Sequence, residues 1–280
     1  MLLQPHICAG QEGSFTHMQK RHLRLLFVRG MYFESISETR RLMKYTENGR
    51  AAGDYRYFIS ACYYLGGQYR SVVRSTGEPD GFRSRLLLSQ AYRQAGMYDR
   101  GLAALGNLKY EGLSPHDSYE LFIRRSELML YDYRYEEIFA QTTQARSVIA
   151  DRDALESFIS DLNCYSEIKT RSRLLSASLS ALIPGAGQIY SGRWGHGLLS
   201  FISVALPATA SIYFYRNGRR GLSGSMMFFS AVFYTGNIYG AARSAEYAGM
   251  AAKTEFRDRL IRQHVPSYEP VGKELKRRIF

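Results

Sequence analysis

The sequence has few cysteines and none of the residue patterns that usually carry catalysis or bind a metal. Its three cysteines, Cys8, Cys62 and Cys164, form no Cys-x-x-Cys pair and leave one thiol over in any disulfide scheme, which argues against a zinc site or a disulfide framework. HExxH, GxSxG, P-loop and GxGxxG motifs are all missing. We therefore expect a protein that is not an enzyme, uses no cofactor and buries its cysteines as core residues.

Charged residues are missing from two long stretches, Gly197 to Tyr215 and Leu222 to Ala242. As helices, runs of 19 and 21 residues could each cross a hydrocarbon core of roughly 30 Å. A soluble helix of that length normally carries a charged face. We predict two membrane-spanning helices joined as a hairpin. The alternative is a buried helical pair within a soluble domain.

Acidic residues are outnumbered, with 25 against 37 Lys and Arg. The basic residues are scattered rather than gathered into one stripe, and many flank the uncharged runs, where anionic lipid headgroups would attract them. Residues 253–280 carry eight basic and four acidic side chains, which suits a segment on a membrane surface. We expect a lipid bilayer as partner and no nucleic acid, although a soluble nucleic-acid adaptor remains an alternative.

Residues 1–14 form a short, slightly apolar start. The string from Met1 to Gly10 ends in small residues before polar Gln11 and Glu12, which is typical of the end of a secretory signal peptide whose basic start is missing. The alternative is an irregular terminus.

A turn followed by an aromatic residue recurs four times in the first 150 residues. The four tyrosines lie 37, 29 and 37 residues apart, close to the 34-residue period of tetratricopeptide helix-turn-helix repeats. Each turn stands between two apolar helical stretches, which must stack because neither can bury its stripe alone. The predicted turn residues are Gly30, Tyr32, Gly67, Tyr69, Gly96, Tyr98 and Tyr135.

These turns resemble the tetratricopeptide repeat, whose motif places glycine and an aromatic residue between its two helices. Ser35, Val72, Gly101 and Ile138 stand where that motif often has alanine. The resemblance implies an all-α solenoid over residues 15–170 that binds an extended peptide or a partner helix in a concave groove. An irregular helical bundle is the alternative.

Residues 171–245 form the predicted membrane block. Ser172, Ser176 and Ser180 recur every fourth residue, a small-residue stripe that lets helices approach closely. Pro184 and Gly185 end this segment, which is too short to span and is predicted to be an interfacial or re-entrant helix. The polar and glycine-rich connection that follows contains Gly187, Gln188, Tyr190, Gly192 and Arg193.

The second uncharged run contains the step Gly236-x-x-x-Gly240, with Asn237 and Tyr239 between the two glycines. Such a step allows the hairpin helices to touch or two copies of the chain to associate. An amide within a membrane is a candidate functional group, but we interpret Asn237 as a hydrogen-bond partner of Gln188 or of a backbone carbonyl.

The strings IPGAGQIYSGR (183–193) and YTGNIYGA (234–241) resemble a family of uncharacterised bacterial envelope proteins. Its members combine periplasmic tetratricopeptide-like repeats with a carboxy-terminal membrane hairpin, and the first string is also similar to two-helix families allied to the TM2 domain. The resemblance implies this architecture and an envelope location, and it implies no chemistry.

Three arginines lie in the loop between the two runs, Arg216 to Arg220. The positive-inside rule places this loop in the cytoplasm and the repeats in the periplasm. Residues 246–280 would form a basic tail. We predict a scaffold at the bacterial inner membrane that binds a protein partner through its repeats, in envelope biogenesis or membrane protein assembly. The alternative is a small oligomeric transport or channel component using Gln188, His196 and Asn237.

Overall fold

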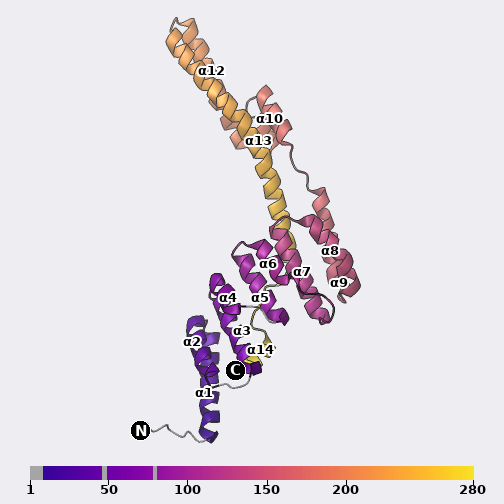
Figure 1. Cartoon of the computed structure of the whole chain (residues 1–280). Helices are drawn as coiled ribbons and strands as arrows, with labels where there is room; N and C mark the ends of the chain where they lie inside the picture. The colour runs from indigo at the N-terminus through magenta and orange to yellow at the C-terminus, as the bar shows by residue number, and fades with distance from the viewer. Residues whose placement is uncertain (1–8, 46–48, 78–80) are drawn as a thin grey trace, which may run out of the picture. The chain divides into compact units, whose positions relative to one another are not determined.

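Every regular element in the described part of the chain is helical. The computed structural model (Figure 1) describes residues 9–45, 49–77 and 81–280 and contains fourteen α-helices and one short 3₁₀-helix there. The expectation of an all-α protein is confirmed for these residues. The interpretation of residues 1–8 as the end of a signal peptide lies outside them, and a helix already begins at Ala9, within the segment expected to be irregular.

The first eight helices form four consecutive pairs. Each helix packs on the next one in the chain, and α3 also packs on α5, and α5 on α7. The first helices of neighbouring pairs therefore lie side by side. The pairs are α1 (Ala9–Val28) with α2 (Tyr32–Met43), α3 (Gly49–Leu65) with α4 (Tyr69–Thr76), α5 (Gly81–Gln94) with α6 (Tyr98–Gly106), and α7 (Pro115–Tyr131) with α8 (Tyr135–Val148).

The four predicted turns share one backbone geometry. Gly30, Gly67 and Gly96 have φ values of 74°, 72° and 72°, and Tyr133 takes the same left-handed conformation at 59°. In each turn the next residue donates its N–H to a carbonyl five residues earlier, as from Met31 to Leu26, which is the bond that closes a Schellman motif. The second helix then begins at the predicted tyrosine, so the aromatic residue marks its first turn.

The helices α1 to α5 share one apolar core with the carboxy-terminal segment. Leu23, Phe58, Cys62 and Leu87 come from α1, α3 and α5, and all four are fully buried. At roughly 1.5–3 kcal/mol for each large buried apolar side chain, stacking the pairs supplies the stability that no single helix pair can supply.

The start of α7 is set by a local signal, because the Ser114 hydroxyl accepts the Asp117 N–H and Pro115 follows.

The remaining helices differ in length far more than the first eight. The elements after α8 are α9 (Arg152–Asn163), η1 (Cys164–Glu167), α10 (Arg173–Leu182), α11 (Ala186–Tyr190), α12 (Trp194–Arg216), α13 (Arg220–His264) and α14 (Lys273–Ile279).

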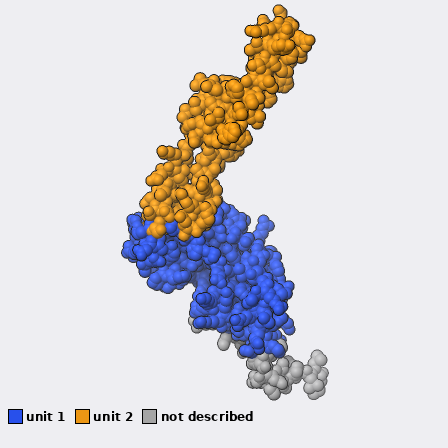
Figure 2. All heavy atoms as spheres, turned by 180° about the vertical axis from the view of Figure 1, so that it is seen from behind, with its two compact units in different colours: residues 1–156, 264–280 blue, residues 157–263 orange. Residues whose placement is uncertain are grey.

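The chain divides into two compact units, coloured separately in Figure 2. Unit 1 comprises residues 1–156 together with 264–280, and unit 2 comprises residues 157–263. This differs from the expected order of a repeat domain over 15–170, a membrane block over 171–245 and a separate tail over 246–280. The helix α13 continues to His264, since no proline or glycine pair interrupts it before Pro266.

The carboxy-terminal segment, residues 264–280, packs on the helix pairs of unit 1. Val271, Leu275 and Ile279 are 1%, 2% and 0% exposed and belong to the same hydrophobic core as Phe58 and Leu87. The expected surface segment is therefore part of a folded core. Between its charged residues an apolar residue recurs at every fourth position, which gives the segment one apolar face.

In unit 2 one helix is long and apolar enough to cross a membrane. This helix is α12, and among the described residues no other passes the same test of length and hydropathy. Only 17% of its apolar stretch is buried, unlike the core helix of a soluble domain. The second expected span is a part of α13, where hydroxyl and amide side chains dilute the apolar residues.

Candidate functional site

The first helices of the four pairs in unit 1 form a surface, called the groove below, that the carboxy-terminal segment covers. From α7 back to α1 the segment makes contacts all along the groove. The Arg124 guanidinium donates to the Pro266 carbonyl at 2.9 Å, Arg83 pairs with Glu274 at 3.0 Å, and Arg278 pairs with Asp54 at 2.8 Å. At the far end the Phe280 ring lies 5.8 Å from Phe27 and 5.7 Å from Phe58. The surface that was expected to take a peptide or a partner helix thus holds a segment of the same chain, which is non-helical over residues 265–272 and helical over Lys273–Ile279.

A buried ionic network fixes the segment to α7. Arg124 is 2% exposed and pairs with Glu120 at 3.1 Å and with Glu127 at 3.2 Å. Gln90 donates to Glu127 at 3.0 Å, so the buried carboxylate has several donors. The Arg124 guanidinium also lies over the Tyr268 ring, 5.3 Å from its centroid. A buried arginine with this many partners holds one geometry.

Tyrosines anchor the middle of the segment. The Tyr57 hydroxyl on α3 donates to the Pro270 carbonyl at 2.9 Å, and the Tyr64 and Tyr268 rings meet edge to face at 5.5 Å. Burial raises the pKa of Tyr268 well above its usual value, and burial also raises the pKa of Tyr57. Both phenols therefore keep their protons at physiological pH.

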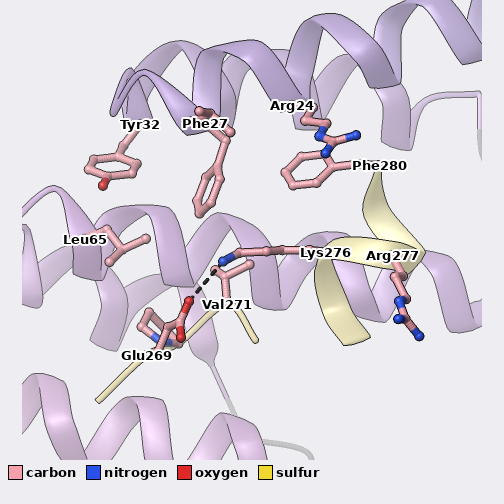
Figure 3. Close-up of a pocket in the computed structure, with 11 residues that line it drawn as sticks. Arg24, Phe27, Tyr32, Leu65, Glu269, Val271, Lys276, Arg277 and Phe280 are labelled. Carbon is pink, nitrogen blue, oxygen red and sulfur yellow. Dashed lines mark hydrogen bonds and ion pairs between the residues drawn. The ribbon is translucent and has the colours of Figure 1, made fainter. Parts of the chain in front are cut away.

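One pocket stays open where the segment meets the first helix pair. Its volume is about 540 Å³, within the range of roughly 300–1,000 Å³ typical of ligand sites. Figure 3 shows its apolar floor, with the Phe27 ring pointing in from α1, Leu65 on α3, and Val271 and Phe280 on the carboxy-terminal segment. The pocket is thus lined partly by the groove and partly by the segment.

The rim of this pocket is basic. Lys276 pairs with Glu269 at 2.9 Å across it (Figure 3). Arg24 and Arg277 also line the pocket, and neither pairs with an acid among the described residues. The rim therefore carries a net positive charge around an apolar floor.

In unit 2 the predicted motif residues form a buried polar cluster. The Gln188 side-chain amide donates to the Asn237 carbonyl at 3.0 Å and to its Oδ1 at 3.1 Å, and the Ser180 hydroxyl donates to Gln188 Oε1 at 2.8 Å. Asn237 Oδ1 also accepts the Gly185 N–H at 2.9 Å, and the Ser180 hydroxyl oxygen accepts the Gly187 N–H at 2.9 Å. The contact expected between Asn237 and Gln188 is present, and these amides satisfy backbone groups.

Close backbone approach explains the glycines of the first string. A Cβ atom on Gly185 would lie 2.1 Å from the Gly197 carbonyl oxygen, and one on Gly187 would lie 1.9 Å from that of Ser176. The Ser176 hydroxyl donates to the Gly187 and Ala241 carbonyls at 2.9 and 2.8 Å. Residues 186–190 form the helix α11 rather than the expected irregular connection, and Pro184 precedes it.

The other predicted residues of the block lie around this cluster. Gly192 (φ 82°) and Arg193 form the same turn as in the helix pairs of unit 1, and Tyr190 packs under the Arg171 guanidinium. Gly240 faces Gln188, whereas Gly236 meets no atom within 4 Å and Tyr239 is exposed. Of the predicted Gly-x-x-x-Gly step, only Gly240 takes part in packing within the chain.

The two long helices of unit 2 contact each other through serines. Ser211 on α12 donates to the Ser223 carbonyl of α13 at 2.9 Å, and Ser230 on α13 donates to the Val204 carbonyl at 3.1 Å. Figure 1 shows the two helices side by side along this stretch. Buried serines and exposed leucine and phenylalanine side chains give this pair a polar inside and an apolar outside.

The comparisons leave the site to be interpreted from its own geometry. No family model, curated protein or solved structure matches the chain. In the part of the chain that the structure describes, no group of three or more His, Cys, Asp or Glu side chains could hold a metal ion.

Sequence reasoning missed the groove-filling segment altogether. Its signal was the spacing of Val271, Leu275 and Ile279, which places three apolar side chains on one helical face. The charge of the segment alone predicts a membrane surface. That charge does not mark Tyr268 and Phe280, the two aromatic residues that anchor the segment.

Proposed function

We propose that this protein is a membrane-anchored helical-repeat scaffold that binds a protein partner through unit 1, at the bacterial inner membrane. The observation that carries the proposal is the groove of unit 1, which holds the carboxy-terminal segment by an arginine-to-carbonyl bond, ion pairs and aromatic contacts. Stacked helix pairs offer extended surfaces that such proteins use for binding. Envelope biogenesis and membrane protein assembly are the processes that suit such a scaffold.

The arrangement of unit 2 supports membrane anchoring. Leu199, Phe201 and Leu206 of α12 are between 47% and 66% exposed, while Ser211, Ser230 and Asn237 are at most 7% exposed. In water this pattern would leave a large apolar surface uncovered. In lipid it is favourable, because small and polar residues join the helices and apolar residues face the acyl chains. We include the part of α13 around residues 222–242 as the second span.

The partner chemistry follows from the open pocket. An apolar side chain would fill the floor formed by Phe27, Leu65 and Val271, and a carboxylate beside it would meet Arg24 or Arg277. We propose that the partner presents a segment with a large apolar residue next to an acidic one. The carboxy-terminal segment occupies the rest of the groove and forms one wall of this site.

The orientation follows from the basic loop between the spans. Arg216, Arg219 and Arg220 would lie in the cytoplasm and unit 1 in the periplasm. A reporter enzyme inserted at Gly218 and one fused after Phe280 would report opposite compartments, with periplasmic activity only at Phe280. Periplasmic activity at Gly218 would reverse the orientation.

In-cell photo-crosslinking tests the scaffold role. A photoreactive residue at Val28, on the pocket wall and 74% exposed, should capture a protein that a probe at the exposed Glu136 of α8 does not. Capture should fall when Arg24 and Arg277 are both changed to Glu, since these charges then repel an acidic segment. Equal capture at Val28 and Glu136, or capture unchanged by the charge reversal, would contradict this partner site.

A transport role for unit 2 has less support. The side-chain amides of Gln188 and Asn237 make their hydrogen bonds within the cluster, so they are not available to a passing solute. His196 is exposed and bonds to Arg193. Solute flux into proteoliposomes that disappears in Gln188→Ala and Asn237→Ala, with folding retained, would favour the transport role instead.

A further inference from the structure

A polar cavity in unit 2 combines two arginines with no acidic lining residue. It has a volume of about 450 Å³ and lies where α11, α12 and α13 meet. Its inner wall carries Gln188, Ser200 and Ser244, and its rim carries Arg193, His196 and Arg243.

We propose that this cavity binds the phosphate of an anionic phospholipid headgroup. The inference rests on the proposed placement of unit 2 in a membrane, and it goes beyond the scaffold role of unit 1.

The charges around the cavity are incompletely neutralised within the chain. Arg193 donates to His196 Nε2 at 2.8 Å and pairs with no acid among the described residues. Arg243 pairs with Glu246 at 2.9 Å, but the same carboxylate also serves Arg173 at 3.7 Å. Glu246 therefore serves two guanidinium groups, and Arg193 has no acidic partner among the described residues. Since a guanidinium presents paired donors that match phosphate oxygens, the cavity suits that anion.

The cavity lies at the polar end of the apolar surface of α12. Tyr239 lines it and is 69% exposed, and Trp194, the residue after Arg193, is 73% exposed. Such rings settle at the headgroup level of a bilayer. One turn further along α12, the exposed Leu198 and Phe201 begin the apolar surface. A lipid phosphate at this level would meet Arg193 and Arg243 without moving either side chain into hydrocarbon.

A second, apolar cavity distinguishes a phospholipid from free phosphate. It has a volume of about 300 Å³, and its lining includes Pro184, Ile189, Trp194 and Phe201. Both cavities lie against the first turns of α12, one polar and one apolar. A lipid would place its headgroup in the first and part of an acyl chain along the second, whereas inorganic phosphate would use only the first.

Trp194 is the only tryptophan in the chain, so its fluorescence reports directly on the first turn of α12, where the two cavities lie. The full chain is reconstituted in phosphatidylcholine vesicles doped with phosphatidylglycerol that carries brominated acyl chains, or with brominated phosphatidylcholine. We expect the brominated phosphatidylglycerol to quench Trp194 at a severalfold lower mole fraction than brominated phosphatidylcholine. Loss of both arginines should abolish that preference.

The decisive variant is Arg193→Gln with Arg243→Gln, both partly exposed positions, and its matched control is Arg216→Gln with Arg219→Gln at the other end of α12. Loss of the preference in the first variant alone supports the site. An equal preference in both variants would overturn it. Circular dichroism confirms that both variants keep their helices, and Arg193→Lys with Arg243→Lys tests whether charge alone suffices.

Two further outcomes separate the sources of failure. Inorganic phosphate that abolishes the preference at millimolar concentration would assign the cavity to a free anion and overturn the lipid assignment. If neither brominated lipid quenched Trp194, unit 2 would not lie in the bilayer. That result would overturn the anchor of the proposed function and the lipid site with it.

Discussion

Tyr133 occupies a backbone conformation that three glycines adopt at the equivalent turns. Its φ of 59° lies in the left-handed region, which costs a residue with a side chain about 1–2 kcal/mol. Tyr133→Gly should therefore raise the free energy of unfolding by about 1 kcal/mol, measured by urea unfolding followed by circular dichroism. Gly96→Ala is the converse control and should cost a similar amount, because its Cβ meets nothing within 4 Å and only the φ is strained. A destabilised Tyr133→Gly would mean that the ring's contact with Tyr135, at 6.5 Å, outweighs the backbone cost.

Arg124 holds the carboxy-terminal segment through a buried charge. In Arg124→Met, the buried Glu127 would keep only Arg93, at 3.3 Å, as a guanidinium partner, and the Pro266 carbonyl would lose its donor. We expect a loss of about 1–3 kcal/mol in the free energy of unfolding. The control is Arg83→Met, whose pair with Glu274 is exposed and should cost about 0–1 kcal/mol. Similar losses in the two variants would contradict a central role for Arg124.

The buried thiol of Cys62 should make unit 1 less stable as the pH becomes alkaline. Burial raises the pKa of its thiol to about 12, whereas a thiol in the unfolded chain ionises near pH 8.5. The unfolded chain therefore loses the proton first, so stability is fully present below about pH 8.5 and falls as the pH rises toward 12, by up to about 1.4 kcal/mol per pH unit. Cys62→Ala should flatten the fall in urea unfolding measured between pH 8 and 10. An unchanged slope would mean that the thiol is not the titrating group.

At the scale of elements, local signals are sufficient to place the turns and the helix starts of the four helix pairs. The turns at Gly30, Gly67 and Gly96 can be predicted because a left-handed glycine that ends a helix depends only on the residues close to it in sequence. The same turn at Gly192 and Gly218 was not predicted, since no tyrosine marks the start of the second helix there. The buried contact between Gln188 and Asn237 was predicted from chemistry, because an amide in an apolar segment needs a partner.

The glycines of the first string provide a test of packing between elements. Gly187→Ala would force the Ser176 carbonyl away from α11, and backbone on both sides cannot yield. We expect a loss of about 1–3 kcal/mol or more, seen as a lower thermal midpoint of Trp194 fluorescence in detergent. Gly195→Ala is the matched control: its Cβ meets nothing within 4 Å, and it lies within α12, where alanine favours a helix. Its midpoint should stay equal or rise, and a fall as large as that of Gly187→Ala would remove the close-approach explanation.

At the scale of the molecule, the pairing of the carboxy-terminal segment with unit 1 could not be predicted from local signals. Arg278 and Asp54 are 224 residues apart in sequence, and which groove an apolar face fills depends on the shape of both partners. Charge counting assigned residues 253–280 to a lipid surface because it ignored the spacing of the apolar residues. The long helix α13 likewise continues beyond the expected membrane block, since a helix ends at a breaker and not at a boundary of hydropathy.

The buried position of the carboxy-terminal segment in the groove leads to a last prediction. Leu275→Glu would place a carboxylate on a face that is 2% exposed, so α14 should leave the groove at least part of the time. Removing one buried leucine from water contributes about 1.5–3 kcal/mol, so the amides of residues 268–280 should exchange hydrogen about ten- to a hundredfold faster. Lys273→Glu, at an exposed position in the first turn of α14, is the control and should leave exchange unchanged, since an acid there suits the helix dipole. Faster exchange confined to residues 268–280 would mean that the helix pairs of unit 1 fold without the segment. Faster exchange in α1, α3 and α5 as well would mean that the segment is part of the cooperative core, and equal exchange in both variants would contradict the buried position of Leu275.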